Sequence, residues 1–338
     1  MAHIDDGVRQ RLEALSFLLW SDAAAVDSAE TLPATHLEAF SAAGLYGIFA
    51  PAHEGGLELG FPEMCAVVEQ LASACVATTF VWVQHFRFLG SMLAPTTPAA
   101  MRQRWRAPAI SGAVKGGVAL TGLMPGPPRL VAEPTADGWA LQGEAPWVSG
   151  WDIVDVLEVV ARGPGDTVVS FLLDVQSHSQ PGLAVTPARL SAMNATRTVR
   201  LEFSAFMVSE DRVLGQEPYE AGGQHPERLR LNGSFALGVT RRCCLLIGPS
   251  PLDDELRARR DQLDHATAAT MAAARAAACE LAVRAAHVLV ITRGSRSALA
   301  GDVAERLSRE ASLLLVFASR PALKAALLGH FQGSAGPG

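Results

Sequence analysis

The sequence lacks the residue patterns of several common protein classes. Its five cysteines lie in apolar stretches without the spacing of a metal site or a disulfide framework, so we expect buried free thiols. The histidines are scattered, and no metal is predicted; His85, which lies among aromatic residues, is expected to be a core histidine. The formal net charge is −6, and no basic stripe could follow a phosphate backbone. These absences argue against a nucleic-acid partner.

Targeting segments and nucleotide motifs are also missing. The N-terminus MAHIDDGVRQ is acidic where a signal peptide is basic and then apolar. No uninterrupted apolar stretch reaches the length of a membrane span. We therefore expect a cytoplasmic protein without a membrane partner. No GxGxxG follows a predicted strand and no GxxxxGK[ST] occurs, so a dinucleotide would have to be held by other means.

The periodicity of the apolar residues changes twice along the 338 residues. In residues 1–113 apolar residues recur at intervals of three and four residues, as in GFPEMCAVVEQLASACVATTF. This spacing predicts a helical domain, and the stretch GLYGIFAPAHEGGLELG predicts a loop that interrupts it. Residues 114–215 consist of short strands. Residues 216–338 return to the helical period, with a long Ala-rich segment at 266–291. We predict an α+β protein with an N-terminal helical domain, a middle β-domain and a C-terminal helix bundle.

The middle region contains five predicted strands. They are GGVALTG, GWALQGEAPW, VDVLEVVAR, TVVSFLLDV and TRTVRLEF, and turn signals such as ADG and GPGD separate them. In the last of them Val199, Leu201 and Phe203 alternate with polar residues, as in a strand with one buried face. The spacing predicts a small antiparallel barrel or sandwich.

These regions and their motifs, in this order, resemble the acyl-CoA dehydrogenase family over almost the whole chain. The stretch AAGLYGIFAPAHEGGLELGFPEMCAVVEQLA is similar to the family's N-terminal signature, and GVALTG to the strand that leads to the flavin. GWALQGEAPWVSGWDIVDVLEVVA resembles the segment in which a Trp and a small hydroxyl residue lie along the flavin ring. VSEDRVLG is similar to the exit from the β-domain, and AGDVAERLSREASLLLVF to the penultimate helices. Each motif alone is weak evidence, but their shared order is specific.

The resemblance implies an FAD enzyme that removes two hydrogens from an acyl-CoA or another acyl thioester. It implies that Thr121, Trp147 and Ser149 lie around the flavin ring. It further implies a homodimer or homotetramer, with an electron-transfer flavoprotein as a possible acceptor. The family's Arg-x-x-Phe-Gly run, which binds the FAD pyrophosphate of a neighbouring subunit, is replaced by GPSPLDDELRARRDQL. The remaining candidate cations for this half of FAD are Arg241, Arg242, Arg293 and Arg296.

The reaction requires a base, and its chemistry demands a carboxylate in a dry pocket. Many family members carry this Glu in a Tyr-Glu-Gly-Thr run, where this chain has VFASRP with Ala318 at the matching position. Other members place it earlier, in a Glu-Arg-Leu run that resembles PERLRLNG, which makes Glu227 the base and Arg228 the arginine that follows it. A second interpretation stays open. Pro226 suits the first position of a helix, and an acid in the first turn gains about 0.3–1 kcal/mol from the helix dipole.

Two departures keep other functions open. The loop TGLMPGPPRLV replaces the family's polar flavin loop, and its prolines offer few N–H donors, so it either clamps a flavin or covers core. The same frame serves flavin-dependent monooxygenases, which take reduced flavin from a reductase and need no Glu base. The altered loop, the lost arginine run and Ala318 also fit a flavin-free homologue that acts as a binding or assembly partner, because fold does not fix function.

Overall fold

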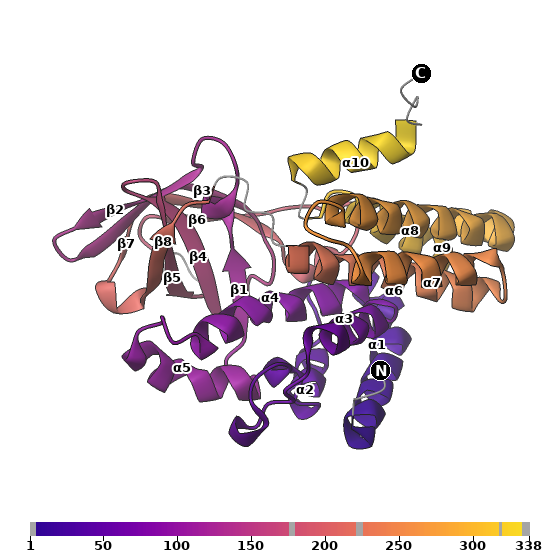
Figure 1. Cartoon of the computed structure of the whole chain (residues 1–338), viewed down its shortest axis with the longest axis horizontal. Helices are drawn as coiled ribbons and strands as arrows, with labels where there is room; N and C mark the ends of the chain where they lie inside the picture. The colour runs from indigo at the N-terminus through magenta and orange to yellow at the C-terminus, as the bar shows by residue number, and fades with distance from the viewer. Residues whose placement is uncertain (1–4, 176–179, 221–225, 318–319, 333–338) are drawn as a thin grey trace.

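The computed structural model describes residues 5–175, 180–220, 226–317 and 320–332. Helices occupy both ends of the chain and strands the middle, and Figure 1 shows the sheet at one end of the molecule. The predicted α+β architecture is therefore confirmed. The domain boundaries after residues 113 and 215 remain a prediction, and the second of them falls inside the last strand.

The N-terminal helical part surrounds an apolar core. Its helices are α1 (Asp6–Ser28), α2 (Ala34–Ala42), α3 (Phe61–Ala72), α4 (Val76–Leu93) and α5 (Ala99–Ser111). The side chain of Asp5 caps α1 by accepting hydrogen bonds from the N–H groups of Gly7 and Val8. The apolar residues that recur along α1 at three and four are buried, as their spacing predicts.

The loop predicted between the early helices is present. It contains the short 3₁₀ turns η1 (Leu45–Gly47) and η2 (Ala52–Glu54), and backbone hydrogen bonds of 2.9 Å join Leu57 to Gly47 and Leu59 to Ile48. The chain thus folds back on itself here, which brings Gly56 against the carbonyl of Ala50.

The middle region forms one eight-stranded sheet. Its strands are β1 (Gly116–Ala119), β2 (Leu130–Thr135), β3 (Gly138–Val148), β4 (Val156–Gly163), β5 (Thr167–Asp174), β6 (Leu183–Pro187), β7 (Val199–Val208) and β8 (Val213–Pro218). The strand order is β6-β7-β3-β2-β4-β5-β8, with β1 beside β4.

The prediction of a purely antiparallel sheet was wrong. β1 runs parallel to β4, from the pair Gly116 and Val156 to the pair Ala119 and Val159, and β2 meets β4 in parallel at one pair. The reason is topological: the β2–β3 hairpin lies between β1 and β4 in the sequence and carries the chain back to the end of the sheet where β1 began. The other pairings are antiparallel.

The C-terminal helices pack against one another and against α3. They are α6 (Pro226–Ile247), α7 (Pro251–Asp264), α8 (Met271–Arg293), α9 (Val303–Leu314) and α10 (Pro321–Gln332), with the 3₁₀ turn η6 (Gly294–Ala298) after α8. α8 is the central helix and packs against the other four. Ser250 is the N-cap of α7, and its N–H donates to Asp253 Oδ2 at 2.9 Å.

Helix α4 joins the first helical part to the sheet. It packs on β1 so closely that a Cβ at Gly116 would overlap the side chain of Phe88. His85 of α4 is buried; its Nδ1 accepts from the Gly116 N–H at 2.9 Å, and its Nε2 donates to the Ala109 carbonyl at 3.0 Å. Burial lowers the pKa of His85 to about 3. The prediction of a core histidine is confirmed, as is that of five buried free thiols.

Candidate functional site

Trp147 is an exposed aromatic residue in a strained conformation. It lies near the end of β3, where the pairing with β7 is irregular between Ala145 and Val148. Its side chain is 70% exposed and its φ is 63°, in the left-handed region that residues with a side chain rarely adopt. The backbone conformation costs free energy in the isolated chain. The surface of the indole is therefore a candidate contact for a planar ligand.

Ser149 begins a chain of buried hydroxyl groups. Its Oγ lies 2.7 Å from Thr198 Oγ1, which in turn lies 2.8 Å from Thr196 Oγ1. Thr196 donates its proton to the carbonyl of Met193 at 2.8 Å. Because each hydroxyl has one proton, Thr198 donates to Thr196 and Ser149 donates to Thr198. The Ser149 proton is then used in the bond to Thr198, and only the lone pairs of its oxygen are available to a further partner, which has to be a hydrogen-bond donor.

Thr121 is buried in the 3₁₀ turn η3 (Thr121–Leu123), directly after β1. The residues that follow, 124–129, are exposed, so the loop does not cover core. Its carbonyl groups are held from outside: Arg320 donates to the Leu123 carbonyl at 3.1 Å, and Arg162 to the Gly122 carbonyl at 3.4 Å. The loop is fixed in place although its prolines supply no N–H groups.

The elements that carry these three residues are in contact. β1 packs against β3, and a Cβ at Gly117 would lie 3.6 Å from the Ser149 carbonyl oxygen. The turn η3 also packs against β3. The elements that carry Thr121, Trp147 and Ser149 are thus in contact, although no hydrogen bond joins Thr121 to the other two in the described part of the chain.

Glu227 and Arg228 lie in the first turn of α6 and differ in environment. Glu227 is exposed, whereas a base for this chemistry calls for a buried carboxylate. Arg228 is half-buried. Burial, together with the nearby charges of Arg87 and Arg320, lowers the pKa of Arg228. Ala318, the position that resembles the family's other base, lies outside the described residues.

A buried ion pair near Arg228 was not predicted from the sequence. Glu158 of β4 is fully buried, and its carboxylate accepts hydrogen bonds from Arg87 Nε at 2.6 Å and from Ser91 Oγ at 2.8 Å. Burial raises the pKa of Glu158, and Arg87 opposes that change. The signal in the sequence is a charged residue inside an apolar run, in VDVLEVVAR for Glu158 and in VWVQHFRFLG for Arg87.

The candidate phosphate-binding arginines divide into two groups. Arg242 is engaged, because its guanidinium lies 3.8 Å from the ring centre of Trp20 and its Nε donates to the Ser73 carbonyl at 2.5 Å. Arg293 is held by both carboxylate oxygens of Asp302. The side chains of Arg241 and Arg296 make no hydrogen bond or ion pair with any residue that the structure describes.

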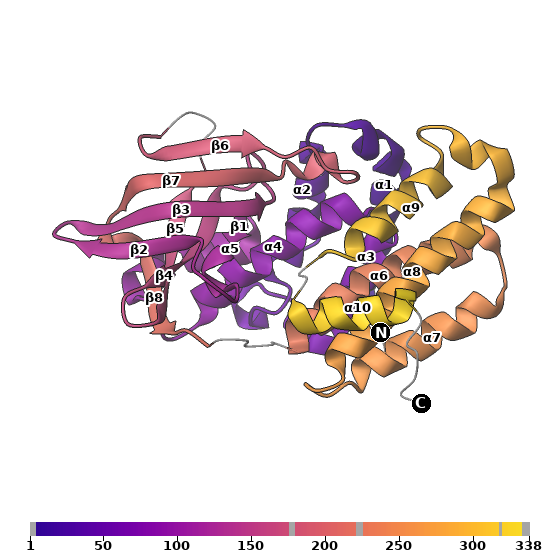
Figure 2. The same ribbon diagram turned by 90° about the horizontal axis from the view of Figure 1, so that it is seen from above.

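Neither free arginine lies near the end of the sheet that holds Trp147. Arg241 is fifteen residues into α6, which is about 22 Å along the helix from its start. Arg296 belongs to the connection between α8 and α9, which lies at the end of the helical part far from the sheet (Figure 2).

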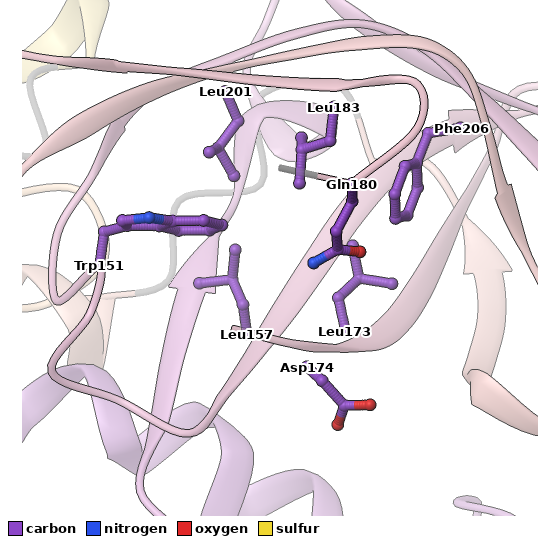
Figure 3. Close-up of a pocket in the computed structure, with 8 residues that line it drawn as sticks. All are labelled: Trp151, Leu157, Leu173, Asp174, Gln180, Leu183, Leu201 and Phe206. Carbon is purple, nitrogen blue, oxygen red and sulfur yellow. The ribbon is translucent and has the colours of Figure 1, made fainter. Parts of the chain in front are cut away.

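A small pocket lies within the sheet structure itself. It is lined mainly by apolar side chains and has room for about one water molecule (Figure 3). The lining residues are Trp151, Leu157, Leu173, Asp174, Gln180, Leu183, Leu201 and Phe206. Asp174 is paired with Arg212 at 2.5 Å, and its carboxylate turns away from the pocket. The pocket is too small for a cofactor or an acyl chain.

The described residues lack two further kinds of functional element. They contain no group of three or more His, Cys, Asp and Glu side chains arranged to hold a metal ion. No helix among them combines the length and the apolarity that crossing a bilayer requires.

Comparisons with known proteins agree with the resemblance seen in the sequence. The model of the acyl-CoA dehydrogenase N-terminal domain matches residues 18–113. The mitochondrial 2-methylacyl-CoA dehydrogenase of Solanum tuberosum is 28% identical over 221 residues, which are 61% of this chain and 52% of that protein. The chain spans about half the length of the curated relatives it matches.

Solved structures share the fold over nearly the whole chain. Butyryl-CoA dehydrogenase from Megasphaera elsdenii matches with a TM-score of 0.78 and 15% identity, covering 98% of this chain and 99% of that one. Dibenzothiophene monooxygenase from Paenibacillus sp. A11-2 matches with a TM-score of 0.75 and 18% identity, covering 97% of each chain. The predicted resemblance to acyl-CoA dehydrogenases is thus confirmed, and the fold is theirs.

Proposed function

We propose that this chain is an FAD-dependent oxidoreductase that introduces an α,β double bond into an acyl thioester. The observation that carries this proposal is Trp147, which has an exposed indole and a strained backbone near the end of β3. It precedes the buried hydroxyl chain that starts at Ser149. The relatives named above, which act on acyl-CoA, support the same chemistry.

Trp147, Ser149 and Thr121 supply groups that fit the ring half of a flavin. Trp147 supplies a planar face, Ser149 accepts a hydrogen bond from a ring N–H, and Thr121 supplies a further hydroxyl. A flavin held by these residues would supply the acceptor for the hydride that leaves the β-carbon of the substrate. Arg241 and Arg296 are free to bind phosphate, and because they lie far from Trp147, they would serve the FAD of a neighbouring subunit in a homodimer or homotetramer.

Glu227 is proposed as the base that takes the α-proton, with Arg228 beside it. The carboxylate is exposed in the isolated chain. A thioester that lies between the start of α6 and the sheet would cover it, and the loss of water strengthens a carboxylate base. The electrons would then leave through an electron-transfer flavoprotein, and the enzyme would work in the cytoplasm.

A flavin-dependent monooxygenase is the second candidate. The exposure of Glu227 favours it, because that reaction needs no buried carboxylate at this position. The fold is compatible, since dibenzothiophene monooxygenase shares it.

The test is an absorbance spectrum of the purified protein before and after addition of FAD or FMN, followed by titration with acyl-CoA thioesters. Flavin bands that bleach with a thioester are the expected result. Bands that respond only when reduced flavin, oxygen and an aromatic substrate are supplied would favour the monooxygenase. A colourless protein that takes up neither flavin would overturn both and leave the flavin-free binding partner.

A further inference from the structure

The loop that follows β1 has few backbone groups with which to hold itself in place. Residues 125–128 include three prolines, which lack the N–H that a turn uses for hydrogen bonds. Inside η3 the N–H of Leu123 donates to the Leu120 carbonyl, and the N–H of Met124 to the Thr121 carbonyl, each at 3.0 Å. The carbonyl groups of residues 122–124 are therefore left for donors from other elements.

One of these donors comes from the C-terminal part of the chain. Arg320, which lies directly before α10 and is half-buried, donates from Nη1 to the Leu123 carbonyl at 3.1 Å. The two residues are 197 positions apart in the sequence. Figures 1 and 2 show that α10 begins at the side of the helical part that faces the sheet. The bond thus joins the start of α10 to the loop that carries Thr121.

Arg162 of β4 reaches the two neighbouring carbonyl groups. Its Nε donates to Gly122 at 3.4 Å and its Nη2 to Met124 at 3.5 Å. These bonds are long, but the guanidinium is fixed in orientation, because it lies 3.2 Å from the ring centre of Tyr219 and its Nη1 lies 3.3 Å from Asp166 Oδ1. The Tyr219 hydroxyl donates to the Met124 carbonyl at 3.4 Å. Three successive carbonyl groups are thus bound from outside the loop.

The turn η3 also packs tightly against β4. A Cβ at Gly122 would lie 2.6 Å from the Val160 carbonyl oxygen and 2.8 Å from the Cα of Ala161. Because the turn already contacts the backbone of this strand, loss of an outside bond would let it move away from β4. Thr121 is the first residue of the turn, so its hydroxyl would move with it.

We propose that Arg320 is a positioning residue for the flavin: it holds η3, and with it the Thr121 hydroxyl, in the place from which Thr121 contacts the flavin ring. This inference rests on the function proposed above and adds a residue that sets the geometry of its cofactor site. Arg320 acts through the Leu123 carbonyl, which is a neutral acceptor. Lysine, which donates from a single point, should therefore replace it in part.

The first measurement needs no flavin. Hydrogen–deuterium exchange with mass spectrometry of residues 120–129 reports chiefly on the N–H groups of η3, because prolines contribute none. We expect Arg320→Met, which keeps an apolar stem, to speed exchange in this segment about tenfold and to leave β3 and β7 unchanged. Unchanged exchange in the loop would overturn the inference. Faster exchange over the whole sheet would overturn it as well, because a general loss of stability would then explain the effect.

The second measurement is a titration with FAD, followed by the absorbance spectrum of the flavin. Arg320→Met should raise the Kd about tenfold and shift the flavin bands, because the contact of the ring with Thr121 is lost. Thr121→Val should produce the same shift. Since both changes remove one contact, the double variant should bind no more weakly than the weaker single one. Arg320→Lys should restore part of the affinity. Fully additive losses would overturn the inference.

The matched control is Arg129→Met. Arg129 is exposed at the end of the same loop, and its side chain pairs with Glu144 and not with a loop carbonyl. This variant loses the same charge beside the loop and should keep both the slow exchange and the flavin Kd of the unmodified protein. Melting temperatures check that each variant folds. Loosening of the loop in Arg129→Met as large as in Arg320→Met would contradict the role of the carbonyl bond.

The unmodified protein separates this inference from the proposed function. If it takes up neither FAD nor FMN, the function fails, and the role of Arg320 toward a flavin fails with it. If it binds flavin and Arg320→Met binds flavin equally well with the same spectrum, the function stands and the inference alone is overturned.

Discussion

The carboxylate of Glu158 on β4 accepts a hydrogen bond from Arg87 Nε on α4, with 2.6 Å between the two atoms. The pair is the polar centre of an otherwise apolar contact between the first helical part and the sheet. Ser91, one turn further along α4, binds the second carboxylate oxygen at 2.8 Å. The pair and Ser91 therefore fix the position of α4 against β4.

Breaking this pair should destabilise the protein strongly. Glu158→Gln leaves the guanidinium of Arg87 mostly buried without its counter-charge, and the expected loss is about 3 kcal/mol of unfolding free energy, measured by urea titration. The double variant Arg87→Met with Glu158→Leu removes both charges and should recover most of that loss. A double variant as unstable as the single one would show that packing, and not the unpaired charge, is responsible.

Replacement of Trp147 by glycine should stabilise the protein and weaken flavin binding. Trp147→Gly relieves the backbone strain at φ 63°, and we expect the flavin-free protein to gain about 0.5 to 1 kcal/mol of unfolding free energy while the Kd for flavin rises at least tenfold. Ala205→Gly is the matched control, because Ala205 has a φ of 49° on β7. It should gain similar stability without a change in flavin affinity. Unchanged flavin binding in Trp147→Gly would remove the indole from the site.

Two adjacent glycines should respond very differently to alanine. A Cβ at Gly56 would overlap the backbone carbonyl of Ala50, so Gly56→Ala is expected to cost about 3 kcal/mol or more. Gly55 has a φ of 90° but open space around it, so Gly55→Ala should cost only its backbone strain, about 1 kcal/mol. Urea titrations of the two variants give the comparison. Equal losses would mean that the loop shifts to admit the side chain.

The sequence predicted β1, β3, β4, β5 and β7 and missed β2, β6 and β8. β3, β4, β5 and β7 carry apolar alternation or buried apolar runs, which a period of two reveals. β6 and β8 are the two edges of the sheet, and most of their residues are exposed, so no apolar pattern marks them. The parallel pairing of β1 with β4 depends on the path of the chain between them, which a local pattern does not contain.

The site was predictable only in part for a similar reason. Trp147 and Ser149 were found through a motif, but Trp147 lies at an irregularity in the pairing of β3 with β7, which no local pattern contains. Arg87 and Glu158 are 71 residues apart. Each is visible as a charge in an apolar run, and only the fold shows that the two neutralise each other.

A buried carboxylate in the helical part should make stability depend on pH. Burial raises the pKa of Glu310 on α9 to about 7, and Arg306, at 3.8 Å, opposes this. The charges of Asp27, Arg309 and Glu305 also act on it. Because the folded pKa is above the unfolded value, the folded state binds the extra proton between pH 4.5 and 7, and stability falls as the pH rises through that range.

Glu310→Gln should remove this dependence. The unfolding free energy of the variant minus that of the unmodified protein is expected to increase by about 2 to 3 kcal/mol from pH 5 to pH 8. Urea titration at both pH values measures this difference. Glu220→Gln removes an exposed carboxyl group and should leave the difference in unfolding free energy between pH 5 and pH 8 unchanged. A Glu310→Gln curve parallel to that of the unmodified protein would contradict the prediction.

The role of Glu227 can be separated from a purely helical one. If it is the base, Glu227→Gln lowers the rate of thioester-dependent flavin bleaching at least a hundredfold, because general base catalysis contributes about 10² to 10⁴ in rate. Flavin binding should stay intact. If Glu227 only suits the helix end, the variant loses less than about 1 kcal/mol of unfolding free energy and bleaches at the original rate. Stopped-flow absorbance and urea titration of Glu227→Gln decide between the two roles, with Glu220→Gln as the control. Loss of a base lowers the rate of bleaching, whereas loss of a helix-end acid lowers only the unfolding free energy.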